Sequence, residues 1–94
     1  MTLLYWTPEA VQDRDSIYDY IQADNPAAAI AMDELFEKNT RNLTDHPQMG
    51  RIGRVEGTRE LVVHHHYVVV YDLVGGAVRV LRWLHTARRW PLQN

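Results

Sequence analysis

Three runs of β-branched and aromatic residues dominate the second half of the chain, and only a few turn-forming residues separate them. The runs are TRELVV (58–63), YVVVYDL (67–73) and AVRVLRWL (77–84). Residues of these types favour extended backbone. Gly75–Gly76 lies between the last two runs and is typical of a two-residue hairpin turn. The pattern predicts a three-stranded antiparallel meander, and it constrains the fold more than any other feature.

The first half predicts a short strand followed by two helices. TLLYW (2–6) is a short run with aromatic residues and indicates a strand. Thr7 and Pro8 favour a helix start, because the hydroxyl can accept from an unpaired amide and proline has no amide to leave unpaired. Asn25–Pro26 repeats this combination for a second helix, which we expect to end near residues 46–47.

Apolar residues at helical spacing mark the face that each helix should bury. They are Val11, Ile17, Tyr18 and Ile21 in the first helix, and Ala28, Met32, Leu35, Phe36 and Leu43 in the second. Only two or three residues join the helices, which predicts an antiparallel hairpin. We therefore expect one α+β domain over residues 1–94, in which an N-terminal edge strand and a helical hairpin pack on a small twisted antiparallel sheet. A chain of 94 residues with 46% hydrophobic content suits one such core.

Composition excludes several classes of site. The chain has no cysteine, so it can form neither a disulfide framework nor a thiolate metal site. The N-terminus lacks the basic start and apolar core of a signal peptide. No apolar stretch approaches the roughly 20 residues of a membrane span. We expect a soluble cytoplasmic protein that contacts no membrane.

The two halves of the chain carry opposite charge. Residues 1–50 hold three basic residues against nine acids, whereas residues 51–94 hold seven arginines against three acids. Arginine suits carboxylates, phosphates and aromatic faces. The basic half therefore indicates an acidic partner surface, a nucleic acid, or both. The alternative is that the two halves neutralise each other within one fold.

The histidine run His64–His66 admits three interpretations. Two histidines on one side of a strand can chelate zinc, but a zinc site needs a third ligand, such as His46, Glu60 or His85. A polar turn between two apolar strands needs no further residue. A polar recognition role for the turn is the third possibility.

The segment LRWLHTARRWP (81–91) brings arginines, tryptophans and a histidine together. Arginine interleaved with tryptophan can bind nucleic acid through phosphate contacts and stacking. Histidine is the side chain that most often serves as a general acid or base, so His85 is a candidate for proton transfer. The alternative is that the tryptophans pack in the core and the arginines pair with acids of the helices.

The motifs GRVEGTRELVVHHHYVVVYD (53–72) and VRVLRWLHTARRWP (78–91) resemble the RelE/ParE toxins of type II toxin–antitoxin modules. The resemblance covers nearly the whole chain, and the ending is similar to the H-A-R-R-Q-[WF]-P tail of ParE-like members. It implies a short helical C-terminal tail, a cognate antitoxin as partner, and no metal or cofactor. The family typically has H-P-N where this chain has His64–His66, which favours the turn interpretation.

Members of this family act in one of two ways. RelE-like members cleave mRNA on the ribosome with a strand arginine, whose position holds Val68 here. ParE-like members inhibit DNA gyrase. The missing arginine favours gyrase inhibition by a non-enzymatic toxin, for which the target-binding candidates are His85, Arg88, Arg89 and Trp90. The alternative is a ribosome-dependent endoribonuclease with Arg59 and His85 as the catalytic pair. A third possibility is a degenerate toxin that binds only its antitoxin.

The antitoxin is expected to place carboxylates against a set of arginines and apolar anchors in a groove beside the helical hairpin. These arginines are Arg51, Arg54, Arg59, Arg79 and Arg82. Such a segment would fold on binding.

Overall fold

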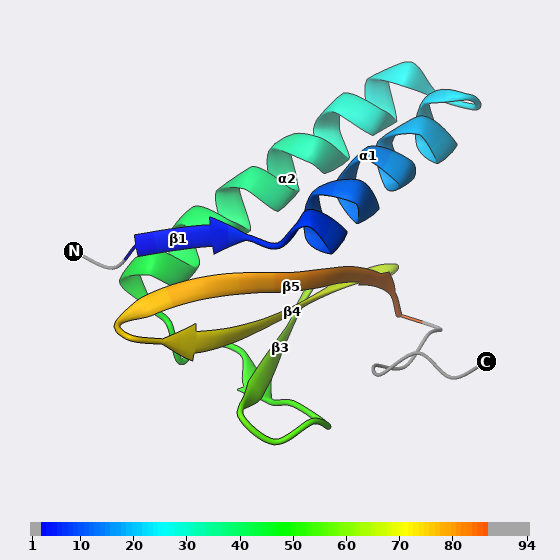
Figure 1. The fold of residues 1–94 in the computed structure, drawn as a ribbon. Coiled ribbons are helices and arrows are strands. Elements are labelled where there is room, and N and C mark those ends of the chain that lie inside the picture. Colours follow the sequence, from blue (N-terminus) through cyan, green and yellow to red (C-terminus); the bar gives the residue numbers. More distant parts are fainter. Residues whose placement is uncertain (1–2, 87–94) are drawn as a thin grey trace.

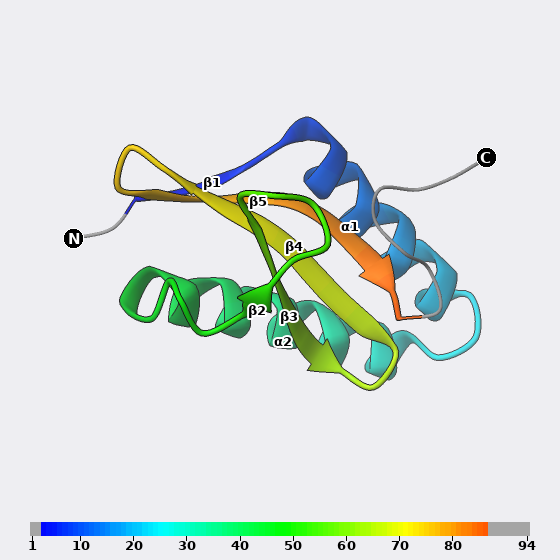
Figure 2. The ribbon, with the colours of Figure 1, turned by 90° about the horizontal axis from the view of Figure 1, so that it is seen from below.

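The computed structural model describes residues 3–86 as a layer of two helices packed on a five-stranded sheet (Figure 1). The elements are β1 (Leu3–Trp6), α1 (Pro8–Gln22), α2 (Pro26–Asp45), β2 (Arg51–Ile52), β3 (Thr58–His64), β4 (Tyr67–Val74) and β5 (Ala77–His85). Seen from the sheet side, the strands cross in front of both helices (Figure 2). Within residues 3–86, neither helix has the length and apolarity to cross a bilayer.

Both predicted helix starts are confirmed. The Thr7 hydroxyl accepts a hydrogen bond from the Ala10 amide at 3.1 Å and donates one to the Leu81 carbonyl at 2.9 Å. The Asn25 side chain accepts from the Ala28 amide at 3.1 Å. Thr7 therefore both begins α1 and fastens that helix to β5.

The meander of β3, β4 and β5 is confirmed, with both of its turns. Gly75 and Gly76 have φ values of 57° and 78°, as a turn with two left-handed residues requires. His64 is the last residue of β3 and lies opposite Tyr67, so only two histidines form the turn between β3 and β4.

The expectation of an antiparallel sheet needs one correction and one addition. The sheet order is β1-β5-β4-β3-β2, and β1 runs parallel to β5, so the sheet is mixed. Strand direction depends on how the helical hairpin returns the chain to the sheet, and local sequence does not show this. The two-residue strand β2 was not predicted, because two residues are too few to show a period.

The core lies between the helices and the sheet. Phe36 of α2 stacks on Trp83 of β5, with ring centroids 4.0 Å apart and planes 11° apart. Trp6 of β1 lies against the same indole at 5.6 Å. The prediction that Val11 faces the core is wrong, since Val11 is 46% exposed and Ala10 is fully buried instead. The alanine fits where α1 approaches the sheet closely.

β4 is buried on both faces. Tyr67, Val69 and Tyr71 point toward the helices and belong to the main core. Val68 and Val70 point the other way, where they form a second apolar cluster with Leu84 and the partly buried Leu81. The loop that joins β2 and β3 lies across this side of the sheet (Figure 2). Burial on both faces explains why β4 is almost continuously apolar.

Candidate functional site

Arg59 on β3 is held by the loop that connects α2 to β2. Its guanidinium donates to the Gly50 carbonyl at 2.8 Å and to the Gln48 carbonyl at 3.3 Å. The Tyr71 hydroxyl supports the same loop by donating to the Pro47 carbonyl at 2.8 Å and accepting from the Gly50 amide at 2.9 Å. Burial raises the pKa of Tyr71, so the phenol keeps its proton. In this structure Arg59 binds backbone rather than facing an open site.

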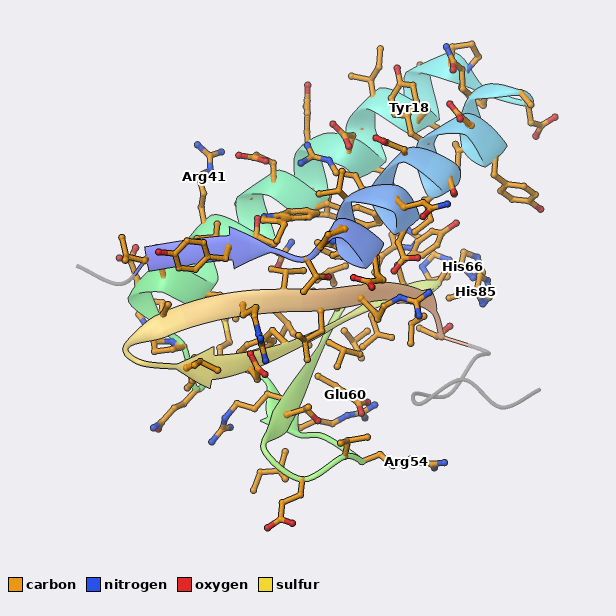
Figure 3. The ribbon with its side chains drawn as sticks, in the orientation of Figure 1. Tyr18, Arg41, Arg54, Glu60, His66 and His85 are labelled. Atoms are coloured by element: carbon orange, nitrogen blue, oxygen red, sulfur yellow. The ribbon has the colours of Figure 1, made fainter. Side chains whose placement is uncertain are left out.

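The structure does not bring Arg59 and His85 together. Arg59 lies opposite Tyr71 and His85 opposite Tyr67, and their strands flank β4 on opposite sides. The backbones of Arg59 and His85 are therefore offset by four residues along the strand direction and by two strand spacings across the sheet. This offset corresponds to a distance of roughly 16 Å. Figure 3 shows His85 at one end of the sheet, far from the β2–β3 region that contains Glu60 and Arg54.

Val68 occupies an apolar environment. Its side chain is 7% exposed and packs with Val70 and Leu84. A cation at this position would have to be buried in that cluster, or the cluster would have to rearrange. The described residues place no arginine in the middle of β4.

Arg82 on β5 is paired with Asp13 on α1. Two guanidinium nitrogens donate to the two carboxylate oxygens at 2.7 and 3.0 Å, and the Trp83 amide donates to the same carboxylate at 3.0 Å. Hydrogen bonding and the charge of Asp13 raise the pKa of Arg82 against the opposing effect of burial. The pair joins the acidic first half of the chain to the basic second half.

The other arginines of the expected antitoxin surface have different environments. Arg79 pairs with Asp72 on the neighbouring strand at 2.7 and 3.1 Å. Arg51 lies 3.3 Å from Glu60, which also accepts from the Arg54 backbone amide at 3.0 Å. Within residues 3–86, the Arg54 side chain is exposed and its guanidinium forms no ion pair. The role of these residues in antitoxin binding stays a prediction.

Four histidines gather at the end of the sheet where the β3–β4 turn meets the end of β5, and Figure 3 shows two of them, His66 and His85, near each other there. Ring centroids lie 4.0 Å apart for His64 and His65, 4.0 Å for His65 and His66, and 5.3 Å for His66 and His85. The His66 amide donates to His64 Nδ1 at 3.1 Å, which makes Nδ1 of His64 an acceptor in this arrangement. Among the described residues, no group of three His, Asp or Glu side chains is arranged to hold a metal ion.

Thr86 fastens the end of β5 to this turn. Its amide donates to the His66 carbonyl at 2.8 Å, and its hydroxyl donates to the His65 carbonyl at 2.9 Å. The turn thus sets the point from which the chain continues toward its last residues. The predicted target-binding residues Arg88, Arg89 and Trp90, like the expected helical tail, lie outside the described residues.

A hollow of about 630 Å³ lies beside the helical hairpin, at a place where the sequence did not predict a site. The Cζ atom of Arg14 lies 5.1 Å from the centroid of the Trp6 ring, and Arg14 Nε lies 2.6 Å from Asp33 Oδ1. The hollow is lined by Trp6, Val11, Arg14, Asp15, Tyr18, Asp19 and Asp33. Its wall is more polar than the apolar groove that we expected beside the hairpin. The acidic residues of α1 are the sequence feature that could have indicated this polar hollow.

Comparison with known proteins places these features in a family context. A family model described as ParE toxin of type II toxin-antitoxin system, parDE, matches residues 4–90. Toxin RelE2 of Caulobacter vibrioides is 35% identical over 88 residues, which cover 94% of this chain and 99% of that protein.

Solved structures share the fold. A chain from the chromosomal ParDE TA system of P. aeruginosa matches with a TM-score of 0.80 and 25% identity, covering 90% of this chain and 96% of that one. The YoeB/ParE toxin from Agrobacterium tumefaciens matches with a TM-score of 0.65 and 20% identity, covering 89% and 98% of the two chains. Two helices on a mixed sheet are therefore common to these chains.

Proposed function

The chain belongs to the ParE toxin family of type II toxin–antitoxin systems, and we propose that it acts by inhibiting DNA gyrase and so stopping DNA replication. The observation that supports this choice is the separation of Arg59 from His85. Metal-independent cleavage of a phosphodiester needs a cation at the developing charge and a proton-transfer group near the same phosphate. Arg59 instead donates to two backbone carbonyls. The position on β4 where RelE-like members have an arginine holds Val68, which is buried and carries no charge.

The loss of such a group has a large effect on a cleavage reaction. Removing one preorganised donor typically costs about 2.7–4 kcal/mol of barrier. A toxin that acts by binding has no such requirement, because a few tryptophan and arginine anchors can supply most of the affinity. We propose that His85, Arg88, Arg89 and Trp90 are the anchors for the target.

A ribosome-dependent endoribonuclease is the second candidate function. It is favoured by the 35% identity to a relative named toxin RelE2. In this function His85 would move protons, and another cation would have to replace the distant Arg59.

A cognate antitoxin is the proposed partner in the cytoplasm. The support comes from the P. aeruginosa neighbour, which is part of a ParDE TA system. Five arginines are the proposed contacts for its carboxylates: Arg51, Arg54, Arg59, Arg79 and Arg82. Arg54 is the best placed of these, because its exposed guanidinium is not engaged by an acid within residues 3–86.

Two assays with purified protein separate the candidate functions. In the first, the protein is added to gyrase and DNA; in the second, to ribosomes programmed with an mRNA codon in the A site. Inhibited supercoiling or trapped DNA cleavage with intact mRNA supports gyrase inhibition. Codon-specific mRNA cleavage with unaffected gyrase contradicts it and supports the endoribonuclease.

Variants of the C-terminal residues test the target-binding assignment in the same assays. Arg88→Ala with Arg89→Ala, or Trp90→Ala, should abolish gyrase inhibition, because anchors of this type are worth about 2 kcal/mol or more each. His85→Gln should have a milder effect, since it keeps most of the packing. Full inhibition by both C-terminal variants would contradict the assignment.

A further inference from the structure

The edge strand β2 leaves the backbone of Ile52 open to a partner. β2 pairs with β3 and stands last in the sheet order β1-β5-β4-β3-β2. The Gly53 amide donates to the Thr58 carbonyl at 2.8 Å, so these two residues form a hydrogen-bonded pair. Bonded and non-bonded pairs alternate along an antiparallel ladder, so the next pair, Ile52 and Arg59, is non-bonded. The backbone N–H and C=O of Ile52 therefore point away from β3, toward the open edge.

The side chain of Ile52 is open as well, because 79% of it is exposed. Residues directly opposite in a sheet share a face, so Ile52 lies on the face of Arg59, whose guanidinium bonds to two carbonyls of the loop before β2. Residues 46–49 of this loop line an apolar hollow of about 580 Å³, and Met49 among them is 44% exposed. This face of the edge therefore offers apolar surface that a partner side chain can cover.

The other face of this edge carries positive charge. Arg51 lies opposite Glu60, and their contact at 3.3 Å is weak because the Arg51 side chain is 68% exposed. The Arg54 guanidinium is exposed and pairs with no acid within residues 3–86. Figure 3 shows Arg54 and Glu60 on the side of the sheet away from the helices. Since the Glu60 side chain is only 15% exposed, the charges open to a partner are two arginines against one acid, Glu56.

Hydrogen bonds hold both sides of β2 in place before a partner arrives. The Tyr71 hydroxyl fastens the preceding loop through the Pro47 carbonyl and the Gly50 amide. On the other side, a Cβ at Gly53 would collide with the Thr58 hydroxyl, so the loop between β2 and β3 closes tightly. An edge that is already ordered loses little conformational entropy when it binds.

We propose that β2 binds an extended protein segment as an additional strand, and that this segment alternates apolar and acidic side chains. The added strand would satisfy the outward N–H and C=O of Ile52. Its successive side chains would point to opposite faces. The residue opposite Ile52 then lies on the apolar face of the edge, and its neighbours lie on the face of Arg51 and Arg54. This geometry selects an apolar residue at the first position and a carboxylate at the second.

The opposite edge of the sheet has a different character. On β1, the exposed Leu3 and Tyr5 lie opposite Ala77 and Arg79, and Arg79 is already paired with Asp72. The charge beside β1 is therefore matched within the chain, whereas the charge beside β2 favours an acidic partner.

The inference shares Arg51 and Arg54 with the proposed antitoxin contacts, but it rests on the open backbone of Ile52. It applies to any segment with the stated pattern, and its test uses neither gyrase nor an antitoxin. Failure of one proposal therefore does not decide the other.

The test measures binding of the full chain to short fluorescent peptides by fluorescence anisotropy. The first peptide alternates valine and glutamate, and the second has lysine in place of each glutamate. We expect the glutamate peptide to bind about tenfold more tightly at low salt, because two exposed arginines attract one peptide and repel the other. The Ile52 amide should exchange its hydrogen more slowly in the complex, since it gains a hydrogen-bond acceptor.

Two further peptides test strand addition itself. In the proposed register, the valine opposite Ile52 exchanges both backbone hydrogen bonds with it. N-methylation of the valines removes the N–H groups that face β2 and should weaken binding about tenfold. N-methylation of the glutamates alters N–H groups that face away from β2, so this peptide is the matched control and should keep most of the affinity.

Three variants of the protein locate the site. Ile52→Pro removes the outward N–H and leaves the ladder with β3 intact, so it should weaken binding about tenfold. Ile52→Thr keeps that N–H and shortens the apolar side chain, so it should lose only part of the affinity. Leu3→Thr alters an apolar residue that is 57% exposed on the other edge, and as the matched control it should bind like the wild type. Circular dichroism melting checks that each variant is folded.

Several results would overturn the proposal. Absence of binding by the glutamate peptide, or equal affinity for the lysine peptide, would remove the charge pairing on which it depends. Equal losses from the two N-methylated peptides would show that the contact is not a strand pairing. Full affinity in the folded Ile52→Pro variant would place the peptide away from β2.

Discussion

The Asp13 carboxylate of α1 accepts three hydrogen bonds from β5, two from the Arg82 guanidinium and one from the Trp83 amide. β1 pairs with β5 only as far as Val80, so Trp83 lies beyond the end of β1 and cannot bond to it. A side chain of α1 thus replaces the missing strand at this edge of the sheet. The charge of Arg82 makes the replacement stronger than a neutral contact.

Asp13→Asn should destabilise the protein by about 1.5–3 kcal/mol, the range for hydrogen bonds to charged groups. The amide keeps one acceptor oxygen but loses the charge that holds Arg82. Urea unfolding followed by circular dichroism measures the change. Asp72→Asn, which breaks the more exposed Arg79 pair, is the matched control and should cost less. Equal losses in the two variants would contradict the special role of Asp13.

Phe36→Ala should be the most destabilising single change in α2. Phe36 is 1% exposed and contacts both Trp83 and Tyr67. Truncating a buried phenylalanine costs about 3–5 kcal/mol, a large part of the stability of a small domain. Thermal melting gives the loss, and Phe36→Leu should restore much of it because it refills most of the volume. A melting temperature close to that of the wild type for Phe36→Ala would disprove the stacked core.

Tyr71→Phe should loosen the loop that follows α2. The change removes the hydroxyl that binds the Pro47 carbonyl and the Gly50 amide, and it leaves a buried amide unpaired. We expect a loss of about 1–3 kcal/mol and faster hydrogen exchange at Gly50. Tyr5→Phe, at a position that is 55% exposed, is the control and should be neutral. Unchanged exchange at Gly50 would argue against this anchor.

The stability of the fold should fall as pH decreases through the titration of His64 and His66 in the β3–β4 hairpin. The folded protein lowers the pKa of His64 and His66 below the ordinary value of 6.5, so the unfolded chain binds protons more readily. The stabilisation is therefore fully present above pH 6.5 and is lost as pH falls through the lowered pKa values.

The measurement compares melting temperature at about pH 7.5 and about pH 5.5, a range that spans histidine titration. His64→Gln with His66→Gln should reduce the pH dependence, whereas His46→Gln should preserve it. A double variant with the full pH dependence of the wild type would show that other groups cause it.

Antitoxin binding should depend on charge and on Arg54 in particular. The association rate should fall as salt rises, because opposite charges steer the encounter. Arg54→Ala should slow association more than Arg41→Ala, which removes the same charge from the exposed surface of α2 (Figure 3). Stopped-flow mixing at several ionic strengths measures both rates. An association rate that does not change with salt concentration would exclude an encounter that is steered by opposite charges.

The local elements of this protein are determined by its sequence. Thr7–Pro8 and Asn25–Pro26 begin the helices. In each pair the first side chain accepts from an otherwise unpaired amide of the first turn, and the proline has no amide that needs a partner. Gly75–Gly76 turns the chain because only residues without Cβ adopt two consecutive left-handed conformations at little cost. The family motifs are also sequence features, and they predicted the fold class correctly.

Tertiary structure alone decided which residues meet. The parallel pairing of β1 with β5 depends on a contact between residues more than 70 positions apart. The pairing of β4 with β5 brings His85 beside the turn between β3 and β4, whereas Arg59 lies on the other side of β4 and opposite Tyr71, four residues further along that strand. Sequence shows that Arg82 and Trp83 are adjacent. It does not show that Trp83 enters the core and that Arg82 reaches Asp13, because their orientation depends on the bulge in β5 and on the position of α1. Such choices arise from packing between segments, which no local pattern records.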